Sequence, residues 1–242
     1  MTTNSVEKSN RHRVMIFDVE TTGLIPKNRE TMSLTEMPHI LQISFVIFDT
    51  QFWSVIKSVD LYINIPLDVD ISVKITELTG ITREMSMNGE LIHNAMREFY
   101  EEYVKCDIIV AHNIQFDREM IRIEIERLGQ RDDDYKVYNN VFNTEYEKMV
   151  GKDIYCTMKY GRNICKIEQN GKNGMYYKSP KLVELYQNLF GMTPQGLHSS
   201  LIDTYVCLRC FVRMRFKFDL SLDKFPKINF IPIIPITNNV DV

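Results

Sequence analysis

The chain has 242 residues, of which 44% are hydrophobic and 25% charged, and its formal net charge is −3. These values are typical of a globular protein and exclude a fibrous or disordered chain and a strongly positive overall field. No apolar run approaches the ~20 residues of a membrane-spanning helix, and the first ten residues are polar, so we expect neither membrane association nor a signal peptide. Five cysteines favour a reducing compartment. We expect an intracellular protein, cytoplasmic or nuclear.

The first half of the chain predicts most of a β-sheet. A short apolar run at 14–17 indicates a buried strand that ends at Asp18. Two longer runs of β-branched and aromatic residues, 40–48 and 52–63, are separated by three residues and predict an antiparallel hairpin. Residues 107–111 indicate another buried strand.

Helical periodicity follows at several places. The predicted helices span 91–104, 118–128, 180–189 and 199–216. We expect Gly129 and Gly191 just past the ends of the second and third helices, and Pro180 at the first position of the third. Strands followed by alternating strands and helices predict an α/β fold with an antiparallel edge and a parallel centre. Segments 25–38 and 130–148 are expected to be loop insertions.

Two carboxylates stand at the end of the first predicted strand. Asp18 and Glu20 are two residues apart, so their side chains project from one face of the strand. Carboxylates held side by side repel each other, and a divalent cation makes the arrangement favourable. Most such triplets are solvated surface charges, but the carboxyl end of a buried strand is where open α/β sheets bind ligands.

Further acidic groups and a histidine lie later in the chain. Asp117 follows the strand at 107–111 and either caps the next helix or belongs to a site. His198 and Asp203 stand at the start of the last long helix, where they add an imidazole and another carboxylate. Oxygen ligands in this number suit Mg²⁺ or Mn²⁺ rather than zinc. Two such ions can stabilise a phosphoryl displacement, and a nearby histidine can accept a proton from the attacking water.

The strings FDVETTGL, HNIQFD and LHSSLID contain these residues. In this order they resemble the three exonuclease motifs of the DnaQ-like, or DEDDh, 3′→5′ exonucleases. That family includes the proofreading epsilon subunit of bacterial DNA polymerase III, ribonuclease T, oligoribonuclease and the TREX nucleases. The resemblance covers about residues 12–214. One departure is Thr79, which precedes a Gly-Ile-Thr turn where the family commonly has histidine; it lies outside the acidic set.

The resemblance implies a ribonuclease H-like mixed β-sheet flanked by α-helices, and two divalent cations as cofactors. Asp18 would contact both cations, Glu20 and Asp203 would complete the tighter site, and Asp117 would hold the second ion. His198 would be the general base, and the product a nucleoside 5′-monophosphate.

The resemblance also implies a binding site for the terminal nucleotide. Thr21 and Thr22 would lie near its 3′-hydroxyl and Leu24 against its base, with Asn113 and Phe116 in the adjoining loop. It further implies an exonuclease domain at 12–218, preceded by a flexible amino-terminus at 1–11 and followed by an extension at 219–242.

Residues 148–181 are basic in an acidic chain. They contain eight basic and two acidic residues, with four tyrosines interleaved. This composition suits binding of single-stranded nucleic acid, or a solvated surface over core tyrosines.

Two weaker patterns remain. Cys207 and Cys210 have C-x-x-C spacing without a second ligand pair, which favours small core residues over zinc. The apolar, proline-containing stretch 230–236 could dock in extended form on its own domain or on a partner, or remain loose.

Three functions compete at this point. We expect a metal-dependent exonuclease acting on single-stranded or frayed DNA 3′ ends. An exoribonuclease would use the same five residues. A nucleic-acid-binding module that kept the fold and lost catalysis is the third alternative, and the presence of all five residues argues against it. A proofreading role would require a separate polymerase or other replication partner. The oligomeric state is left open.

Overall fold

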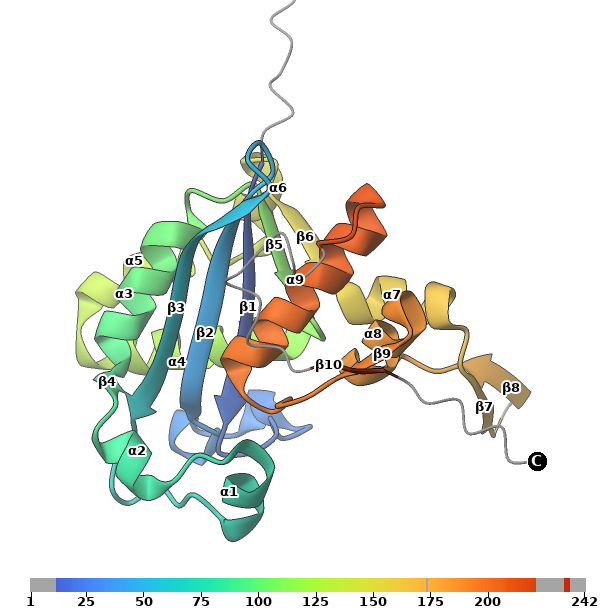
Figure 1. Cartoon of the computed structure of the whole chain (residues 1–242). Coiled ribbons are helices and arrows are strands. Elements are labelled where there is room, and N and C mark those ends of the chain that lie inside the picture. Colours follow the sequence, from blue (N-terminus) through green and yellow to red (C-terminus); the bar gives the residue numbers. More distant parts are fainter. Residues whose placement is uncertain (1–11, 173, 221–232, 236–242) are drawn as a thin grey trace, which may run out of the picture.

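The computed structural model of the protein describes residues 12–172, 174–220 and 233–235 (Figure 1). Its centre is a six-stranded sheet in the order β4-β3-β2-β1-β5-β6. β1 pairs antiparallel with β2, and β2 with β3, whereas β5 and β6 run parallel to β1. The expected mixed sheet is confirmed, but the predicted antiparallel edge and parallel centre are wrong: β3 and β4 pair in parallel at one edge and β5 and β6 at the other, with the antiparallel pairs between them. The strands are β1 (Arg13–Thr21), β2 (Ile40–Asp49), β3 (Ser54–Asn64), β4 (Glu90–Leu91), β5 (Ile108–Ala111) and β6 (Asp153–Cys156).

Helices cover both faces of this sheet (Figure 1). They are α1 (Val73–Thr79), α2 (Arg83–Met87), α3 (Ile92–Tyr103), α4 (Ile114–Arg131), α5 (Lys136–Asn139), α6 (Thr144–Met149), α7 (Thr157–Cys165), α8 (Leu182–Phe190) and α9 (Ser200–Phe216). Two small sheets complete the described structure. One is the hairpin of β7 (Glu168–Gly171) and β8 (Gly174–Tyr177), and the other pairs β9 (Met192–Pro194) with β10 (Ile233–Pro235).

The alternation of side chains along β1 divides the core into two parts. Met15, Phe17 and Val19 pack on the side of α3 and α4, whereas Val14 and Ile16 pack on the side of α9. Because successive side chains of a strand point to opposite faces, the even-numbered positions that follow, Asp18 and Glu20, face the α9 side. The same pattern that builds the core therefore directs both carboxylates toward the last helix.

The turn between β2 and β3 differs from the expected one. Strand pairing resumes at Ser54, so the turn occupies residues 50–53 and the predicted strand start at 52 is wrong. Trp53 lies in this turn with φ 51°, and its ring packs on Phe48 and Phe216. Burial of the indole against α9 fixes the turn, whereas Phe52 is exposed.

The helix expected at 118–128 is longer at both ends. α4 begins at Ile114, so Asp117 lies within its first turn and is not its cap. The helix also continues through Gly129 to Arg131, and the predicted stop is wrong. A Cβ at Gly129 would lie 3.4 Å from Lys136 Cγ, so the small residue accommodates the close approach of the following segment.

Pro180 is not the first residue of its helix either. α8 begins at Leu182, and Lys181 is the cap, with its backbone N–H donating to Glu184 at 2.7 Å. Gly191 follows the helix in the left-handed conformation, as expected. The other predicted helices match α3 and α9 to within a residue at each end.

Of the two predicted insertions, 25–38 is a loop with two short 3₁₀ helices, Arg29–Thr31 and Leu34–Glu36. Segment 130–148 is mostly helical, contrary to the loop prediction. Tyr138, Val141 and Phe142, spaced as on a helix, are buried against the core, and the Phe142 ring lies 4.4 Å from that of Tyr103. This burial stabilises the short helices, which the sequence pattern does not reveal because the residues around these apolar side chains are polar.

The proposed domain ends lie partly outside the described residues. Residues 1–11, the expected flexible amino-terminus, are not described, nor is most of 219–242. Asp219 forms an ion pair with Arg209 on α9, and Leu220 is buried in the core on that side. Within the predicted tail stretch, Ile233–Pro235 pairs antiparallel with β9.

Cys207 and Cys210 are buried on α9, which confirms the core interpretation.

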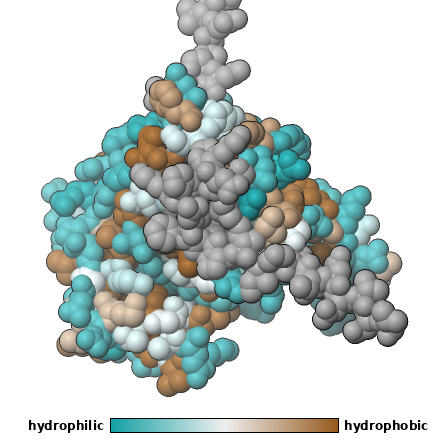
Figure 2. Space-filling model, in the orientation of Figure 1, coloured by the Kyte–Doolittle hydropathy of each residue, from teal (hydrophilic) through white to brown (hydrophobic). Residues whose placement is uncertain are grey.

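No helix in the described part of the chain is both long and apolar enough to cross a membrane. Figure 2 shows that the described surface on this face is mostly hydrophilic, with apolar patches scattered among polar residues.

Candidate active site

Four carboxylates converge at the carboxyl end of β1, although they come from three distant parts of the chain. β5 pairs with β1 only as far as Ile16, and β1 continues beyond it to Thr21. The extension places Asp18 and Glu20 beside the start of α9, which carries Asp203. The start of α4, which carries Asp117, reaches the same strand from the other side.

Glu20, His198 and Asp203 form the tightest group. One ligand atom from each lies within 4.8 Å of those of the other two. A carboxylate pair with an imidazole at this separation can hold a divalent cation, or can hold a cation and a proton acceptor side by side. The structure therefore brings together the acidic strand end and the His–Asp pair that the sequence singled out.

The loop that carries His198 has an unusual backbone. Both Gly196 and His198 have positive φ, 73° and 72°, and a Cβ at Gly196 would lie 2.6 Å from Ile202 Cδ1. The His198 backbone N–H donates to Asp203 Oδ2 at 3.1 Å. Positive φ is rare for a residue with a side chain, so the hydrogen bond and the glycine together hold the imidazole at the exposed mouth of the site.

Asp117 has a different role from the helix cap that its sequence position allowed. It is only 3% exposed, and its Oδ1 accepts a hydrogen bond of 3.3 Å from the Val19 N–H. That N–H lies beyond the end of β5 and would otherwise lack a partner from that strand. The carboxylate thus ties α4 to the strand between Asp18 and Glu20.

Ser200 and Gln42 fix the third side of the site, and neither was singled out from the sequence. Ser200 Oγ donates to the Asp18 backbone oxygen at 2.6 Å, and its N–H donates to Gln42 Oε1 at 3.2 Å. These bonds join the start of α9 to β1 and β2. A serine beside a histidine motif carries no distinguishing sequence signal, because serine is common at helix starts for other reasons.

The pKa values of all four carboxyls are raised. Burial, together with the charges of Asp117, Asp203 and Glu20, raises the pKa of Asp18 well above its ordinary value. Burial and the neighbouring carboxylates raise the pKa of Glu20 to about 8. Burial raises the pKa of Asp117 to about 8 and that of Asp203 to about 7. The four negative charges destabilise one another unless protons or cations offset them.

One oxygen of the site is buried without a partner. Asp203 Oδ1 has no hydrogen-bond partner among the described residues, while Oδ2 accepts the His198 N–H. A buried carboxylate oxygen left unpaired is costly, and a bound cation removes that cost. The donor set is made of hard oxygens with one imidazole, which suits divalent cations.

Thr21 and Thr22 line the approach to these carboxylates. Thr21 is buried, and its hydroxyl donates to the Gly23 backbone oxygen at 2.8 Å, so its oxygen can still accept. Thr22 Oγ1 accepts from the His39 N–H at 2.9 Å and can still donate. Leu24 is 84% exposed beside them and presents a free apolar surface.

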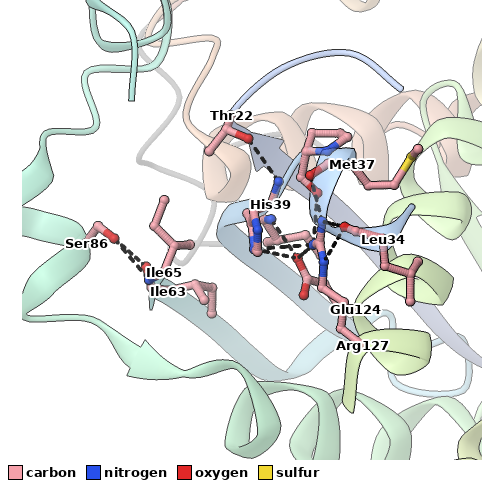
Figure 3. A network of polar contacts seen from close by, with 11 residues as sticks. Thr22, Leu34, Met37, His39, Ile63, Ile65, Ser86, Glu124 and Arg127 are labelled. Carbon is pink, nitrogen blue, oxygen red and sulfur yellow. Dashed lines mark hydrogen bonds and ion pairs between the residues drawn. The ribbon is translucent and has the colours of Figure 1, made fainter. Parts of the chain in front are cut away.

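A buried polar network holds the segment that Thr22 contacts (Figure 3). Arg127 on α4 donates to the backbone oxygens of Leu34 and Met37 and to Glu124 Oε1, the last at 2.8 Å. Glu124 also accepts from the Ile40 N–H at 3.1 Å. The network therefore anchors the end of the 25–38 insertion and the start of β2.

His39 joins this network in its neutral form. Burial, with the nearby Arg127, lowers its pKa to about 4. Its ring therefore accepts from Arg127 at Nδ1, at 3.3 Å, while its backbone pairs with Thr22 in both directions. None of these anchoring residues was expected from the sequence.

The other predicted substrate residues lie at the start of α4, with Asn113 as its N-cap and Phe116 in its first turn. Asn113 has φ 70°, is exposed, and begins the helix without a side-chain cap bond. Phe116 is partly buried against the core. The preceding His112 is held from both ring nitrogens, by Thr157 Oγ1 at 3.0 Å and the Pro180 backbone oxygen at 3.1 Å. Since a carbonyl can only accept, Nε2 carries the proton.

A family model described as Exonuclease, RNase_T, matches residues 15–211. The chain belongs to this exonuclease family. The resemblance to DnaQ-like 3′→5′ exonucleases seen in the motifs is thereby confirmed. The matched range includes the four acidic residues and His198.

Relatives of the chain include replication proteins. The PolC-type DNA polymerase III of Caldanaerobacter subterraneus is 31% identical over 127 residues, which is 52% of this chain and 8% of that protein. The epsilon subunit of DNA polymerase III from Buchnera aphidicola is 25% identical over 210 residues, covering 85% of this chain and 73% of that one. The chain thus spans a small fraction of the PolC protein and most of the epsilon subunit.

Solved structures confirm the fold. E. coli Exonuclease I in complex with a dT13 oligonucleotide has a TM-score of 0.57 at 15% identity, covering 85% of this chain and 42% of that one. A zinc-bound form of the E. coli exonuclease I–single-stranded DNA complex has a TM-score of 0.56 at 16% identity, covering 84% and 41%. The sheet is therefore of the ribonuclease H-like type.

The raised carboxyl pKa values predict how stability depends on pH. Between the ordinary pKa of about 4 and the raised values, the metal-free folded state binds more protons than the unfolded chain, so its stability falls as pH rises through this range. In EDTA, Asp18→Asn should melt at a higher temperature than the wild type, by a margin that grows from about pH 5 to about pH 8.5. Mg²⁺ should raise the Tm of the wild type more than that of the variant.

The matched control for this experiment is Asp70→Asn, the same change at an exposed carboxylate. It should leave both the pH profile and the Mg²⁺ effect unchanged. If the Tm of Asp18→Asn depends on pH and Mg²⁺ in the same way as the Tm of Asp70→Asn and of the wild type, the four carboxylates do not destabilise one another.

The Glu124–Arg127 pair predicts a large effect on stability. Arg127→Ala leaves the Glu124 carboxylate buried without its cation, and the free energy of unfolding should fall by about 3–5 kcal/mol. Arg122→Ala on the same helix removes a half-exposed ion pair with Glu119 and should cost less than about 0.5 kcal/mol. Urea denaturation measures both, and equal losses would contradict a special role for the buried network.

Proposed function

We propose that the protein is a metal-dependent exonuclease that hydrolyses phosphodiester bonds at the 3′ ends of single-stranded or frayed DNA. The products would be nucleoside 5′-monophosphates. The observation that carries the proposal is the convergence of four carboxylates with His198, including a buried Asp203 oxygen that has no partner among the described residues. Mutual repulsion among buried carboxylates destabilises a protein and has no structural benefit, whereas a site for divalent cations uses such a cluster because the cations offset the repulsion.

The residues of the site divide into cation ligands and groups that act on substrate. Asp18, Glu20, Asp117 and Asp203 would hold two divalent cations, Mg²⁺ or Mn²⁺. When bound, these cations stabilise the charge on the attacking and leaving oxygens of the phosphoryl displacement. The carboxylates fit this task because burial keeps their charges weakly screened.

His198 would act as the general base. Its exposed position at the mouth of the site leaves the ring free to accept a proton from the attacking water. The Asp203 hydrogen bond to its backbone and the positive φ angles keep the ring beside the carboxylates rather than turned into solvent. Withdrawal of this proton makes the water a better nucleophile at the phosphorus.

The terminal nucleotide would be bound by the segment after β1. A 3′-hydroxyl both donates and accepts, and the Thr21 oxygen can accept while the Thr22 hydroxyl can donate. Leu24 would pack against the base, with Asn113 and Phe116 nearby at the start of α4. The buried network around Arg127 would keep Thr22 in place.

DNA is the substrate that the comparisons favour. The relatives are components of DNA polymerase III, and E. coli Exonuclease I was solved with a dT13 oligonucleotide. The same relatives support a role in DNA replication, proofreading or repair, and we propose a polymerase as a separate partner. The match to 15–211 supports an exonuclease domain at 12–218.

The first test uses 5′-labelled single-stranded DNA and RNA of one sequence, with Mg²⁺ and with EDTA. We expect a Mg²⁺-dependent ladder that shortens from the 3′ end, faster on DNA than on RNA. A faster ladder on RNA would make the protein an exoribonuclease. No ladder on either strand, with binding retained, would make it a non-catalytic binding module.

Variants of the site test the assigned roles. Asp203→Ala should abolish turnover without unfolding the protein, because it removes one of the repelling carboxylates. His198→Ala should lower kcat by roughly 10²–10⁴-fold, as expected for loss of general base catalysis, with little change in KM. Asp70→Ala is the exposed control and should keep full activity; a His198→Ala enzyme with unchanged kcat would exclude the histidine as the base.

A further inference from the structure

An arm extends from the domain beside the active site. It consists of α7, which packs on α8, and the β7–β8 hairpin, which projects away from the sheet in Figure 1; the described residues of the arm are 157–172 and 174–177. All described residues of the two hairpin strands are exposed. A two-stranded hairpin without a buried face is marginal in water, so its stability and use depend on what it contacts.

The arm begins at the edge of the sheet where the carboxylates lie. α7 follows directly on β6, which runs parallel to β5 and β1, so their carboxyl ends meet at one edge. Thr157, its first residue, contacts His112 in the loop before α4, and Pro180 after the hairpin contacts the same imidazole. Both ends of the arm are therefore anchored beside the loop that leads to Asp117.

One face of α7 is cationic. Lys159 and Arg162 are three residues apart, which places them on one side of α7, and Lys166 follows directly as the C-cap in the left-handed conformation. Lys172 continues the series into the hairpin. All four are exposed, and none forms an ion pair within the part of the chain that the structure describes. Cations that follow one another along α7 and beyond its end are complementary to a row of phosphates.

The hairpin adds exposed aromatic and apolar groups. Tyr176 and Tyr177 are 49% and 44% exposed, and Met175 is 66% exposed. Tyr176 is held by its hydroxyl, which donates to Gln169 at 3.0 Å, and its ring lies over Gly171, where a Cβ would come within 2.9 Å of it. The Tyr177 hydroxyl forms no hydrogen bond with another described residue, and its ring is 44% exposed, which suits stacking.

We propose that this arm binds the single strand upstream of the 3′-terminal nucleotide, with phosphates along the cationic face of α7 and bases on the hairpin tyrosines. The proposal rests on the proposed exonuclease function and adds a second contact region to it. Cations beside aromatic faces are the combination that binds single strands without sequence preference. The arm thus supplies affinity for long substrates, and the carboxylate site supplies the reaction.

The test compares substrate lengths. The triple variant Lys159→Ala/Arg162→Ala/Lys166→Ala should raise KM at least ~10-fold for an oligothymidylate of about 15 nucleotides and leave KM for one of about 3 nucleotides unchanged. kcat should be unchanged on both. The slope of log affinity against log salt should fall by about 2, because three phosphate contacts are lost at ~0.7 each.

Two further variants sharpen the result. Tyr177→Ala should raise KM for the long oligomer roughly 5-fold or more without changing the salt slope, since stacking is not electrostatic. The charge-matched control Lys74→Ala/Arg97→Ala/Arg122→Ala removes three exposed cations elsewhere and should leave both lengths unaffected. Tm measurements confirm that each variant is folded.

The outcomes separate this proposal from the proposed function. If the wild type degrades both lengths and the arm variants match it, the arm does not bind the strand and a protein partner becomes its candidate contact. Equal loss in the control triple variant would also overturn the proposal, because it would indicate a general charge effect. If the wild type degrades neither the long nor the short oligomer, the exonuclease proposal fails. Fluorescence anisotropy of a labelled oligothymidylate in EDTA then still measures whether the arm variants bind the oligomer more weakly than the wild type.

Discussion

Mutual repulsion among carboxylates is the constraint that organises this structure. Asp18 and Glu20 can stand at the end of β1 only because the rest of the fold forces them there. The apolar residues before them bury β1 in the sheet, and α9 and α4 deliver Asp203 and Asp117 to the same end. Packing free energy of the core thus maintains an arrangement that electrostatics alone would disperse.

The contacts around the site serve this arrangement. Asp117 occupies the edge of β1 where β5 has ended, and Ser200 joins α9 to the Asp18 backbone. On the substrate side, Arg127 donates to the backbone oxygens of Leu34 and Met37 and so holds the segment next to Thr22. These anchors join segments that lie far apart in the chain and hold the site together from several sides.

The sequence predicted β1, β2, β3 and β5, the long helices and the carboxylate set, because each depends on local pattern or on recognisable motifs. It did not predict the helices at 136–149, because Tyr138 and Phe142 pack on aromatic rings of α3, and these contacts are known only from the folded structure. Nor did it indicate Gln42, Glu124 or Arg127, whose partners lie far away in the chain. Long-range polar contacts have no periodicity, so residues of this kind are invisible until the fold is known.

The order of the chain has a consequence for when the site comes into existence. β1 lies near the amino-terminus, but Asp203 and the helix that covers Val14 and Ile16 are near the other end. A nascent or truncated chain that lacks α9 has an exposed sheet face and an incomplete set of ligands. The set of four carboxylates is therefore complete only after α9 has been synthesised and has packed on the sheet.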